Sequence, residues 1–193
     1  PAGIFTALEL VRNGSKDEIT IIEQGRLIEN RVCPKSKTKE CIHCKPYCNI
    51  TSGFSGAGAF SDGKLSLNRE VGGDFPSLVG EEFAQQLIDY TDKIYLDFGA
   101  DTHIEGVEKL DEIRDIRKKA TIAGLKLVDC PIRHLGTEKA HQLYYDIEKY
   151  LIDNGVKIIA MKTCNDIIIE DGVCKGVVVE GELGRLAGIE DAV

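Results

Sequence analysis

The chain opens with the stretch PAGIFTALELVRNGSKDEITIIEQG, residues 1–25, which decides the fold class. Apolar residues recur at helical spacing over residues 1–12, and Asn13-Gly14 then supplies a helix stop. The β-branched run ITII, residues 19–22, predicts a short buried strand, and Glu23 stands at its end. A helix, a turn, a strand and an acid in this order predict an α/β fold.

The same stretch carries half of a dinucleotide-binding pattern. Such a site needs a glycine turn that leads into a helix, whose free N–H groups and dipole meet the pyrophosphate, and an acid for the ribose at the end of the next strand. Gly3 stands where the third glycine would let the helix and a strand pack closely, and Glu23 follows 20 residues later. The earlier glycines and their strand would lie upstream, so we expect the chain to be a fragment. An ordinary helix and strand with a solvated Glu23 is the alternative.

Length and charge exclude several classes of protein. The 193 residues suit one domain, or the larger part of one. Lys and Arg total 24 against 32 Asp and Glu, and this net charge of −8 argues against a nucleic-acid binder. No run approaches the roughly 20 apolar residues of a membrane span. We therefore expect a small-molecule substrate and neither a nucleic acid nor a membrane as partner.

Further elements follow from periodicity and turn signals. Helical patterns cover residues 80–98, 107–122 and 137–154, whereas residues 33–63 look irregular. Strand patterns cover residues 125–128, 157–162, 166–170 and 173–179. Asp171-Gly172 predicts a hairpin turn between the last two strands.

Four of the seven cysteines lie close together, at Cys33, Cys41, Cys44 and Cys48. Their spacing, C-x7-C-x2-C-x3-C, suits a zinc ion or an iron–sulfur cluster, since short loops turn several thiolates toward one metal. A redox-active pair formed by Cys41 and Cys44 is a second interpretation, and four reduced thiols in an exposed loop are a third. An odd cysteine count in a chain of this length favours a reducing, cytoplasmic compartment over a disulfide framework.

Glycine and alanine dominate SGFSGAGAFSDGK, residues 52–64, and leave little side-chain bulk. Such a loop lets the backbone approach a flat or charged ligand closely. Phe54 and Phe60 interleave with the glycines, which is less typical of a flexible surface loop, the alternative interpretation.

Arg133 and His134 end a strand-like run and precede the cap-like Thr137. Ligands meet an α/β sheet at its strand ends. Arg133 could hold a carboxylate or phosphate there, and His134 could move a proton at neutral pH. A histidine that caps or packs is the alternative.

Three segments resemble an uncharacterised bacterial and archaeal family described as FAD-dependent, or NAD(FAD)-utilising, dehydrogenases. These segments are PAGIFTALEL, TSGFSGAGAFSDGKLSL with the Cys-rich stretch before it, and CPIRHLGTEKA. The resemblance covers most of residues 1–180 and implies the glutathione-reductase type of FAD fold. It implies FAD as cofactor, NAD(P)H as a candidate electron partner, and a role for Lys64 beside the flavin. In such folds an apolar strand ending in Ala-Thr-Gly follows, and its absence extends the fragment expectation to the C-terminal side.

The sequence thus predicts an α/β, FAD/NAD(P)-binding, Rossmann-like three-layer domain with an α+β insertion, incomplete at both ends. Residues 1–63 and 137–180 would form the cofactor half, residues 64–136 an insertion that faces substrate, and residues 181–193 an unassigned tail. The predicted cofactor-binding residues are Pro1, Ala2, Gly3, Glu23, Gln24, Arg31, Gly56, Ala57, Gly58, Ala59, Phe60, Ser61, Asp62, Gly63 and Cys164. The predicted catalytic residues are Lys64, Arg133 and His134.

The predicted function is an FAD-dependent oxidoreductase, of which this fragment alone could be inactive, with the four cysteines as a metal or iron–sulfur centre near the flavin. A non-catalytic, metal-braced binding module and a thiol–disulfide oxidoreductase using Cys41 and Cys44 are the alternatives. The sequence leaves the substrate, the use of NAD(P)H and the oligomeric state open.

Overall fold

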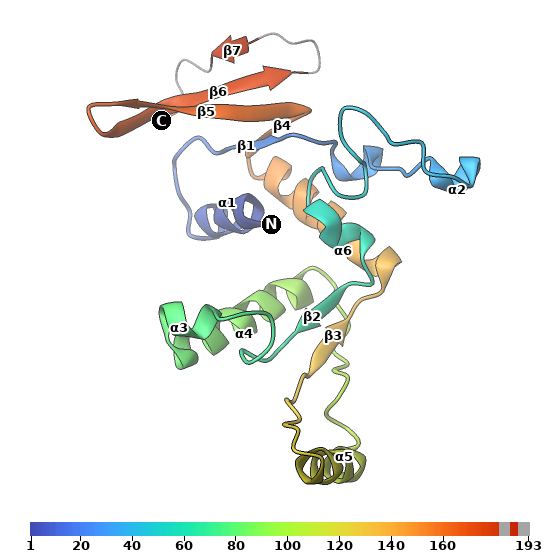
Figure 1. Ribbon diagram of the computed structural model, residues 1–193. Helices are drawn as coiled ribbons and strands as arrows, with labels where there is room; N and C mark the ends of the chain where they lie inside the picture. The colour runs from blue at the N-terminus through green and yellow to red at the C-terminus, as the bar shows by residue number, and fades with distance from the viewer. Residues whose placement is uncertain (182–185, 189–193) are drawn as a thin grey trace. The chain divides into compact units, whose positions relative to one another are not determined.

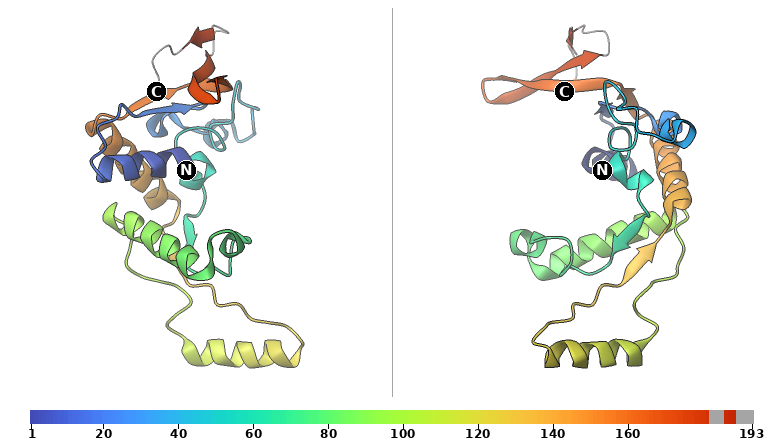
Figure 2. Two further views of the ribbon diagram at one scale, coloured as in Figure 1. Left: turned by 90° about the vertical axis from the view of Figure 1, so that its left-hand side faces the viewer. Right: turned by 45° about the vertical axis from the view of Figure 1, so that its right-hand side comes forward.

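The computed structural model describes residues 1–181 and 186–188, and its contacts divide the chain into two units (Figure 1). Unit 1 comprises residues 1–59 and the described residues from 144 onward, and unit 2 comprises residues 60–143. Figure 2 gives two further views of the ribbon. The predicted tail, residues 181–193, lies largely outside the described residues.

Unit 1 begins with the predicted helix and strand. α1 (Ala2–Arg12) buries Ile4, Ala7 and Leu8 on one face, and Gly14 follows it at a φ of +70°. β1 (Thr20–Glu23) is half-buried along most of its length and ends at the acid. The helix, turn, strand and acid order is therefore confirmed.

β1 pairs in parallel with β4 (Lys157–Ala160), and Glu23 lies opposite Ala160 at the end of both strands. Parallel strands need a crossover connection. Here the connection spans the whole of unit 2 and returns through α6 (Thr137–Asp153). β1 and β4 are therefore neighbours in the sheet although all of unit 2 lies between them in the sequence.

The second sheet of unit 1 is antiparallel and has the order β5-β6-β7. β5 (Lys162–Glu170) and β6 (Val173–Gly181) are joined by Asp171 and Gly172, whose φ values of +52° and +77° suit a tight hairpin turn. β7 (Leu186–Gly188) adds the third strand. The predicted hairpin is confirmed, and both of its strands are longer than the sequence indicated.

Residues 24–59 of unit 1 are mostly loop, and this range includes most of residues 33–63, for which the sequence predicted irregular structure. They hold the 3₁₀ helices η1 (Ile28–Asn30) and η2 (Gly56–Phe60), the latter ending in unit 2, and the single-turn α2 (Lys35–Thr38). Buried apolar side chains of unit 1 come from α1, α6, the loops and the strands. They include Ile4, Ala7, Leu8, Ile28, Phe54, Ala59, Ile147, Leu151, Val156 and Val179.

Unit 2 holds a two-stranded antiparallel sheet of β2 (Lys64–Ser66) and β3 (Ile132–His134), with helices α3 (Phe75–Val79), α4 (Glu81–Asp97) and α5 (Leu110–Ile122). α4 buries Ala84 and Ile94, whereas α5 buries no residue. Figure 1 shows α5 joined to the rest of this unit by two extended segments.

One sequence prediction fails in unit 2, and the bounds of another need correction. Residues 125–128 form no strand, because this exposed connection pairs with no other segment, and the strand forms at residues 132–134 instead. The helix predicted over residues 107–122 begins only at Leu110. The predicted mixture of helices and strands is confirmed, but the parallel part of the described sheets has two strands, so a three-layer Rossmann-like arrangement is not established.

Candidate functional site

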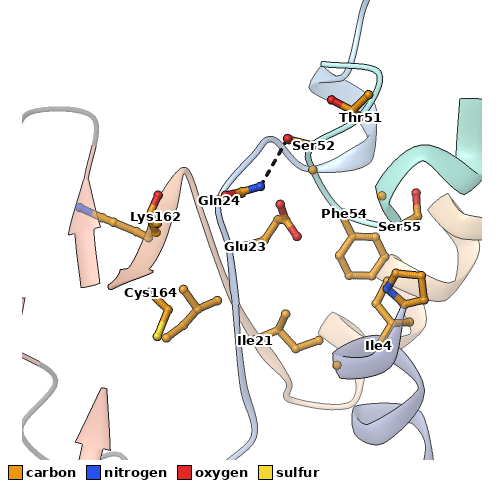
Figure 3. Close-up of a pocket in the computed structure, with 16 residues that line it drawn as sticks. Ile4, Ile21, Glu23, Gln24, Thr51, Ser52, Phe54, Ser55, Lys162 and Cys164 are labelled. Carbon is orange, nitrogen blue, oxygen red and sulfur yellow. Dashed lines mark hydrogen bonds between the residues drawn. The ribbon is translucent and has the colours of Figure 1, made fainter. Parts of the chain in front are cut away.

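Unit 1 contains a cavity of about 430 Å³ to which four separate segments contribute (Figure 3). These segments are the first turn of α1, the end of β1, the loop after Ile50 and the start of β5. The lining residues are Pro1, Gly3, Ile4, Ile21, Ile22, Glu23, Gln24, Thr51, Ser52, Gly53, Phe54, Ser55, Gly56, Lys162, Thr163 and Cys164. The name cofactor cavity is used for this site below.

The first turn of α1 contributes Gly3 and main-chain groups to the cofactor cavity. The amide of Phe5 is the first that bonds within the helix, to the Pro1 oxygen at 3.0 Å, so the amides before it have no intrahelical acceptor. A Cβ at Gly3 would meet no atom within 4 Å. The described strands therefore do not test the close helix–strand packing predicted for Gly3, which stays a prediction, and Gly3 itself lines the cavity.

Glu23 reaches the cavity from the end of β1, as the sequence predicted for the acid. One carboxylate oxygen accepts the Gly25 amide at 2.8 Å, which fixes the turn that follows the strand. Gln24 donates to the Ser52 hydroxyl at 3.4 Å and so links this turn to the neighbouring loop. In Figure 3 Glu23 points from β1 toward the loop that carries Ser52, Phe54 and Ser55.

The loop over residues 49–56 is held by the buried side chain of Arg31, which is 2% exposed. Its guanidinium donates to the main-chain oxygens of Asn49, Ile50, Phe54 and Gly56 at 2.6–2.9 Å and to the Ser55 hydroxyl at 3.2 Å. Burial lowers the pKa of Arg31, and the charges of Glu23 and Cys48 act against this shift. Arg31 does not itself line the cavity. Its hydrogen bonds hold the loop residues that form part of the cavity wall.

Gly53 shows how closely this loop is packed. Its φ is +127°, and a Cβ built on it would lie 2.5 Å from Cδ of Arg31 and 2.7 Å from the oxygen of Arg26. Only glycine fits such a position. The Phe54 amide then bonds to the same Arg26 oxygen at 2.9 Å, so the loop runs beside the chain that leaves β1.

The structure gathers only part of the predicted cofactor-binding set around this cavity. Pro1, Gly3, Glu23, Gln24, Gly56 and Cys164 line it, whereas Ala2, Arg31, Ala57, Gly58 and Ala59 do not. Phe60, Ser61, Asp62 and Gly63 belong to unit 2. The glycine-rich composition that begins at Gly53 was a usable signal for part of what sequence reasoning missed. The missed lining residues are Ile4, Ile21, Ile22, Thr51, Ser52, Gly53, Phe54, Ser55, Lys162 and Thr163.

The three predicted catalytic residues lie on the small sheet of unit 2, where Lys64 and His134 face each other across β2 and β3. Both are partly exposed and have carboxylate neighbours. Lys64 pairs with Asp62 at 2.8 Å, which raises the pKa of Lys64 and lowers that of Asp62. The Nδ1 atom of His134 lies 3.2 Å from Glu105.

Arg133 is 3% exposed and binds within unit 2. Its guanidinium is bonded through two nitrogens to the Asp92 carboxylate and donates to the main-chain oxygens of Asp101 and His103. The bond with Asp92 raises the pKa of Arg133. Because β3 is antiparallel to β2, the argument from the strand ends of a parallel sheet does not apply to Arg133 and His134.

A second cavity in unit 1, of about 340 Å³, is lined by all four clustered cysteines, namely Cys33, Cys41, Cys44 and Cys48. The name cysteine cavity is used for it below. All seven cysteines of the chain are free thiols. Hydrogen bonds from the main chain of Ile50 and Thr51 hold the pKa of the Cys48 thiol below its ordinary value. Among the described residues no three His, Cys, Asp or Glu side chains are grouped closely enough to hold a metal ion, so the predicted metal centre is not shown.

Comparisons with known proteins give no family. No family model matches the sequence, and no curated protein matches it. An L-amino acid deaminase from Proteus vulgaris has a TM-score of 0.41 and 15% identity, over 92% of this chain and 41% of that structure. The L-amino acid deaminase from Proteus myxofaciens, solved in complex with anthranilate, has a TM-score of 0.42 and 14% identity, over 92% and 40%. The chain therefore spans less than half of either structure, and likeness at this level establishes neither fold nor function.

No helix among the residues that the structure describes is long and apolar enough to cross a membrane.

Proposed function

We propose that unit 1 binds a dinucleotide in the cofactor cavity and that the protein is an FAD-dependent oxidoreductase. One observation carries the nucleotide part: the first turn of α1, the acid that ends β1, the glycine-containing loop and the start of β5 all line one cavity. The sequence had marked the first turn of α1 and Glu23 for this role, and of the loop it had marked Gly56. The choice of FAD among dinucleotides rests on the family resemblance.

The residues of the cavity suit an adenosine diphosphate group. Free amides at the start of α1 favour a pyrophosphate, and the Glu23 carboxylate can accept hydrogen bonds from ribose hydroxyls. The start of β5, at Lys162 and Cys164, also lines the cavity and would lie beside an adenine ring. About 430 Å³ lies within the range of small-molecule sites and suits this half of the cofactor.

FAD, when bound, would supply a carrier for two electrons. In this proposal His134, which lies beside Glu105, would move a proton, and Lys64 would supply a positive charge. Arg133 acts as a positioning residue that holds the strand carrying His134. NAD(P)H as electron donor or acceptor, and a cytoplasmic location, remain expectations from the sequence.

The absorption spectrum of the full protein, purified anaerobically, tests the cofactor. Structured flavin bands that bleach with dithionite are expected, and a protein without them overturns the flavoenzyme proposal. Glu23→Ala should weaken FAD binding about tenfold, the effect of losing a hydrogen bond to the ribose. Glu18→Ala is the matched control, since this exposed acid precedes β1 and lies outside the cavity. Equal affinity of the two variants would remove Glu23 from the site.

Two alternative functions from the sequence analysis stay as second candidates, because all four clustered cysteines line one cavity. A thiol–disulfide oxidoreductase would lose turnover in Cys41→Ser or Cys44→Ser while it retains flavin. A metal-braced binding module would contain metal and no flavin.

A further inference from the structure

The segment from Cys33 to Cys48 is clamped at its two ends. The side-chain amide of Asn49 donates to the Val32 oxygen at 2.9 Å, and Nε of Arg31 donates to the Asn49 oxygen at 2.9 Å. These two bonds join the residue before the first clustered cysteine to the residue after the last one. The first and fourth thiols are thereby kept at the same end of a closed loop.

The two inner cysteines are turned toward the same space. Cys41 and Cys44 are separated by two residues, and His43 between them has a φ of +49°, which turns the chain sharply. All four thiols then line the cysteine cavity. A clamped outer pair and a turned inner pair thus line one cavity, which supplies the four thiols that a four-thiolate centre uses.

Apolar packing does not order this segment. None of the residues 33–48 is buried, and the regular structure in it is the four-residue helix α2. Ile42, which lies within the C-x2-C turn, is 55% exposed. Segments without an apolar core usually need a metal or another staple to hold one conformation.

The charges around the cysteine cavity are complementary to thiolates. Four thiolates bound to Zn²⁺ or to an oxidised [4Fe–4S] core leave a net charge of about −2. Lys35 and Lys45 line this cavity, whereas Glu40, the acid of the segment, does not. The local excess of positive charge would offset that negative charge.

We propose that Cys33, Cys41, Cys44 and Cys48 bind one metal centre as thiolates and that this centre orders residues 33–48. Ligation draws the thiols inward into the cysteine cavity, since in the described geometry no three of them share an ion. The shared chemistry is four-thiolate ligation, and the bound species is zinc or an iron–sulfur cluster. This inference goes beyond flavin chemistry and does not depend on it.

Metal analysis of the anaerobically purified full protein tests the proposal. We expect about one zinc per chain, or about two or four irons with a broad absorption band in the visible range. Cys44→Ser should lower the bound metal at least tenfold. Two matched controls should retain it, namely Cys174→Ser, in the β5–β6 hairpin, and His43→Ala, which removes the imidazole from the same cavity.

Proteolysis gives an independent readout that does not require activity. Cleavage after Lys35, Lys37, Lys39 and Lys45 should be slow in the metal-loaded protein and fast after chelation or in Cys44→Ser. The proposal is overturned if the protein carries no stoichiometric metal and all four thiols react with a thiol reagent, or if Cys44→Ser retains its metal. A disulfide within the segment also overturns it. Metal without flavin would overturn the proposed oxidoreductase and support the metal site. Flavin without metal would support the oxidoreductase and overturn the metal site.

Discussion

Unit 1 and unit 2 each bury an arginine, and the two side chains are stabilised by opposite means. Arg31 donates to neutral acceptors, four main-chain oxygens and one hydroxyl, and burial lowers its pKa. Arg133 is bonded through two nitrogens to the carboxylate of Asp92, and its pKa is raised. The difference separates an arginine that shapes a loop from one that forms a buried ion pair.

The comparison bears on both cavities of unit 1. Arg31 brings a positive charge to the loop whose residues Asn49 and Ile50 line the cysteine cavity and whose residues Thr51 to Gly56 line the cofactor cavity. Glu23 and Cys48 favour the charged form of this guanidinium. An anion in either cavity would act in the same direction, since an opposite charge nearby favours the charged form. Arg133 already has its counter-charge in Asp92.

Replacement of Arg31 should have the largest effect. Arg31→Met keeps much of the side-chain length but leaves four main-chain oxygens and the Ser55 hydroxyl without this donor. Each unsatisfied polar group costs about 1–3 kcal/mol, and removal of a buried charge offsets part of the sum. We expect a loss of about 4 kcal/mol in the free energy of unfolding, measured with urea.

The same variant tests whether Arg31 supports ligand binding in the two cavities as well as the stability of the fold. Flavin binding and metal binding should both weaken in Arg31→Met, since the loop that it holds borders both cavities. Arg26→Met is the control, because this half-buried arginine has its main-chain oxygen, and not its side chain, bonded to the loop. If the two variants unfold at the same urea concentration, the prediction that the Arg31 side chain stabilises the loop is wrong.

Asp92→Asn tests the ion pair of unit 2 and should have the second largest effect. The amide can accept one hydrogen bond from Arg133 but leaves a buried positive charge without its counter-charge. We expect a loss of about 3 kcal/mol on thermal or urea unfolding, in the range for breaking a buried pair. Asp89→Asn, one turn earlier on α4, is the control, since it is exposed. A loss below about 1 kcal/mol would place the Arg133 pair among surface salt bridges.

Local patterns explain what the sequence could predict. The helix, strand and acid of residues 1–25, the helix that became α6 and the β5–β6 hairpin depend on residues close in sequence, and all three are present. The place of Glu23 in the cofactor cavity could be predicted because it depends only on the strand that Glu23 ends. Four cysteines within 16 residues could likewise be predicted to line one cavity.

Long-range bonds explain what the sequence could not predict. The partners of Arg31 are main-chain oxygens 18–25 residues away, and main-chain groups leave no mark in a sequence. β2 and β3 have three residues each and exist only because they pair, so residues 125–128, of which three are apolar, gave a stronger but false strand signal. The ion pair of Arg133 with Asp92 joins two elements 41 residues apart, and neither residue carries a motif for it.

The buried acid Glu148 extends the comparison of buried charges and should show the smallest effect. It is 4% exposed on α6 and accepts the Ile28 amide at 3.1 Å. Burial raises its pKa, the Ile28 bond opposes this, and the charge of Glu29 adds to it. An acid whose pKa is raised on folding loses its proton first in the unfolded chain, so the folded state loses stability as pH rises above the ordinary carboxyl pKa of 4.5.

Glu148→Gln removes this charge and keeps an oxygen that can accept the Ile28 amide. The variant and the native protein should be equally stable near pH 4, and the variant should become more stable by at most about 1 kcal/mol near pH 7, because the bond is kept. Urea unfolding at both pH values measures the difference, with the exposed Glu138→Gln on the same helix as control. A variant that is less stable at pH 7 would mean that the Glu148 carboxylate is stabilised in the folded protein, as Arg31 is by Glu23, and not merely tolerated there.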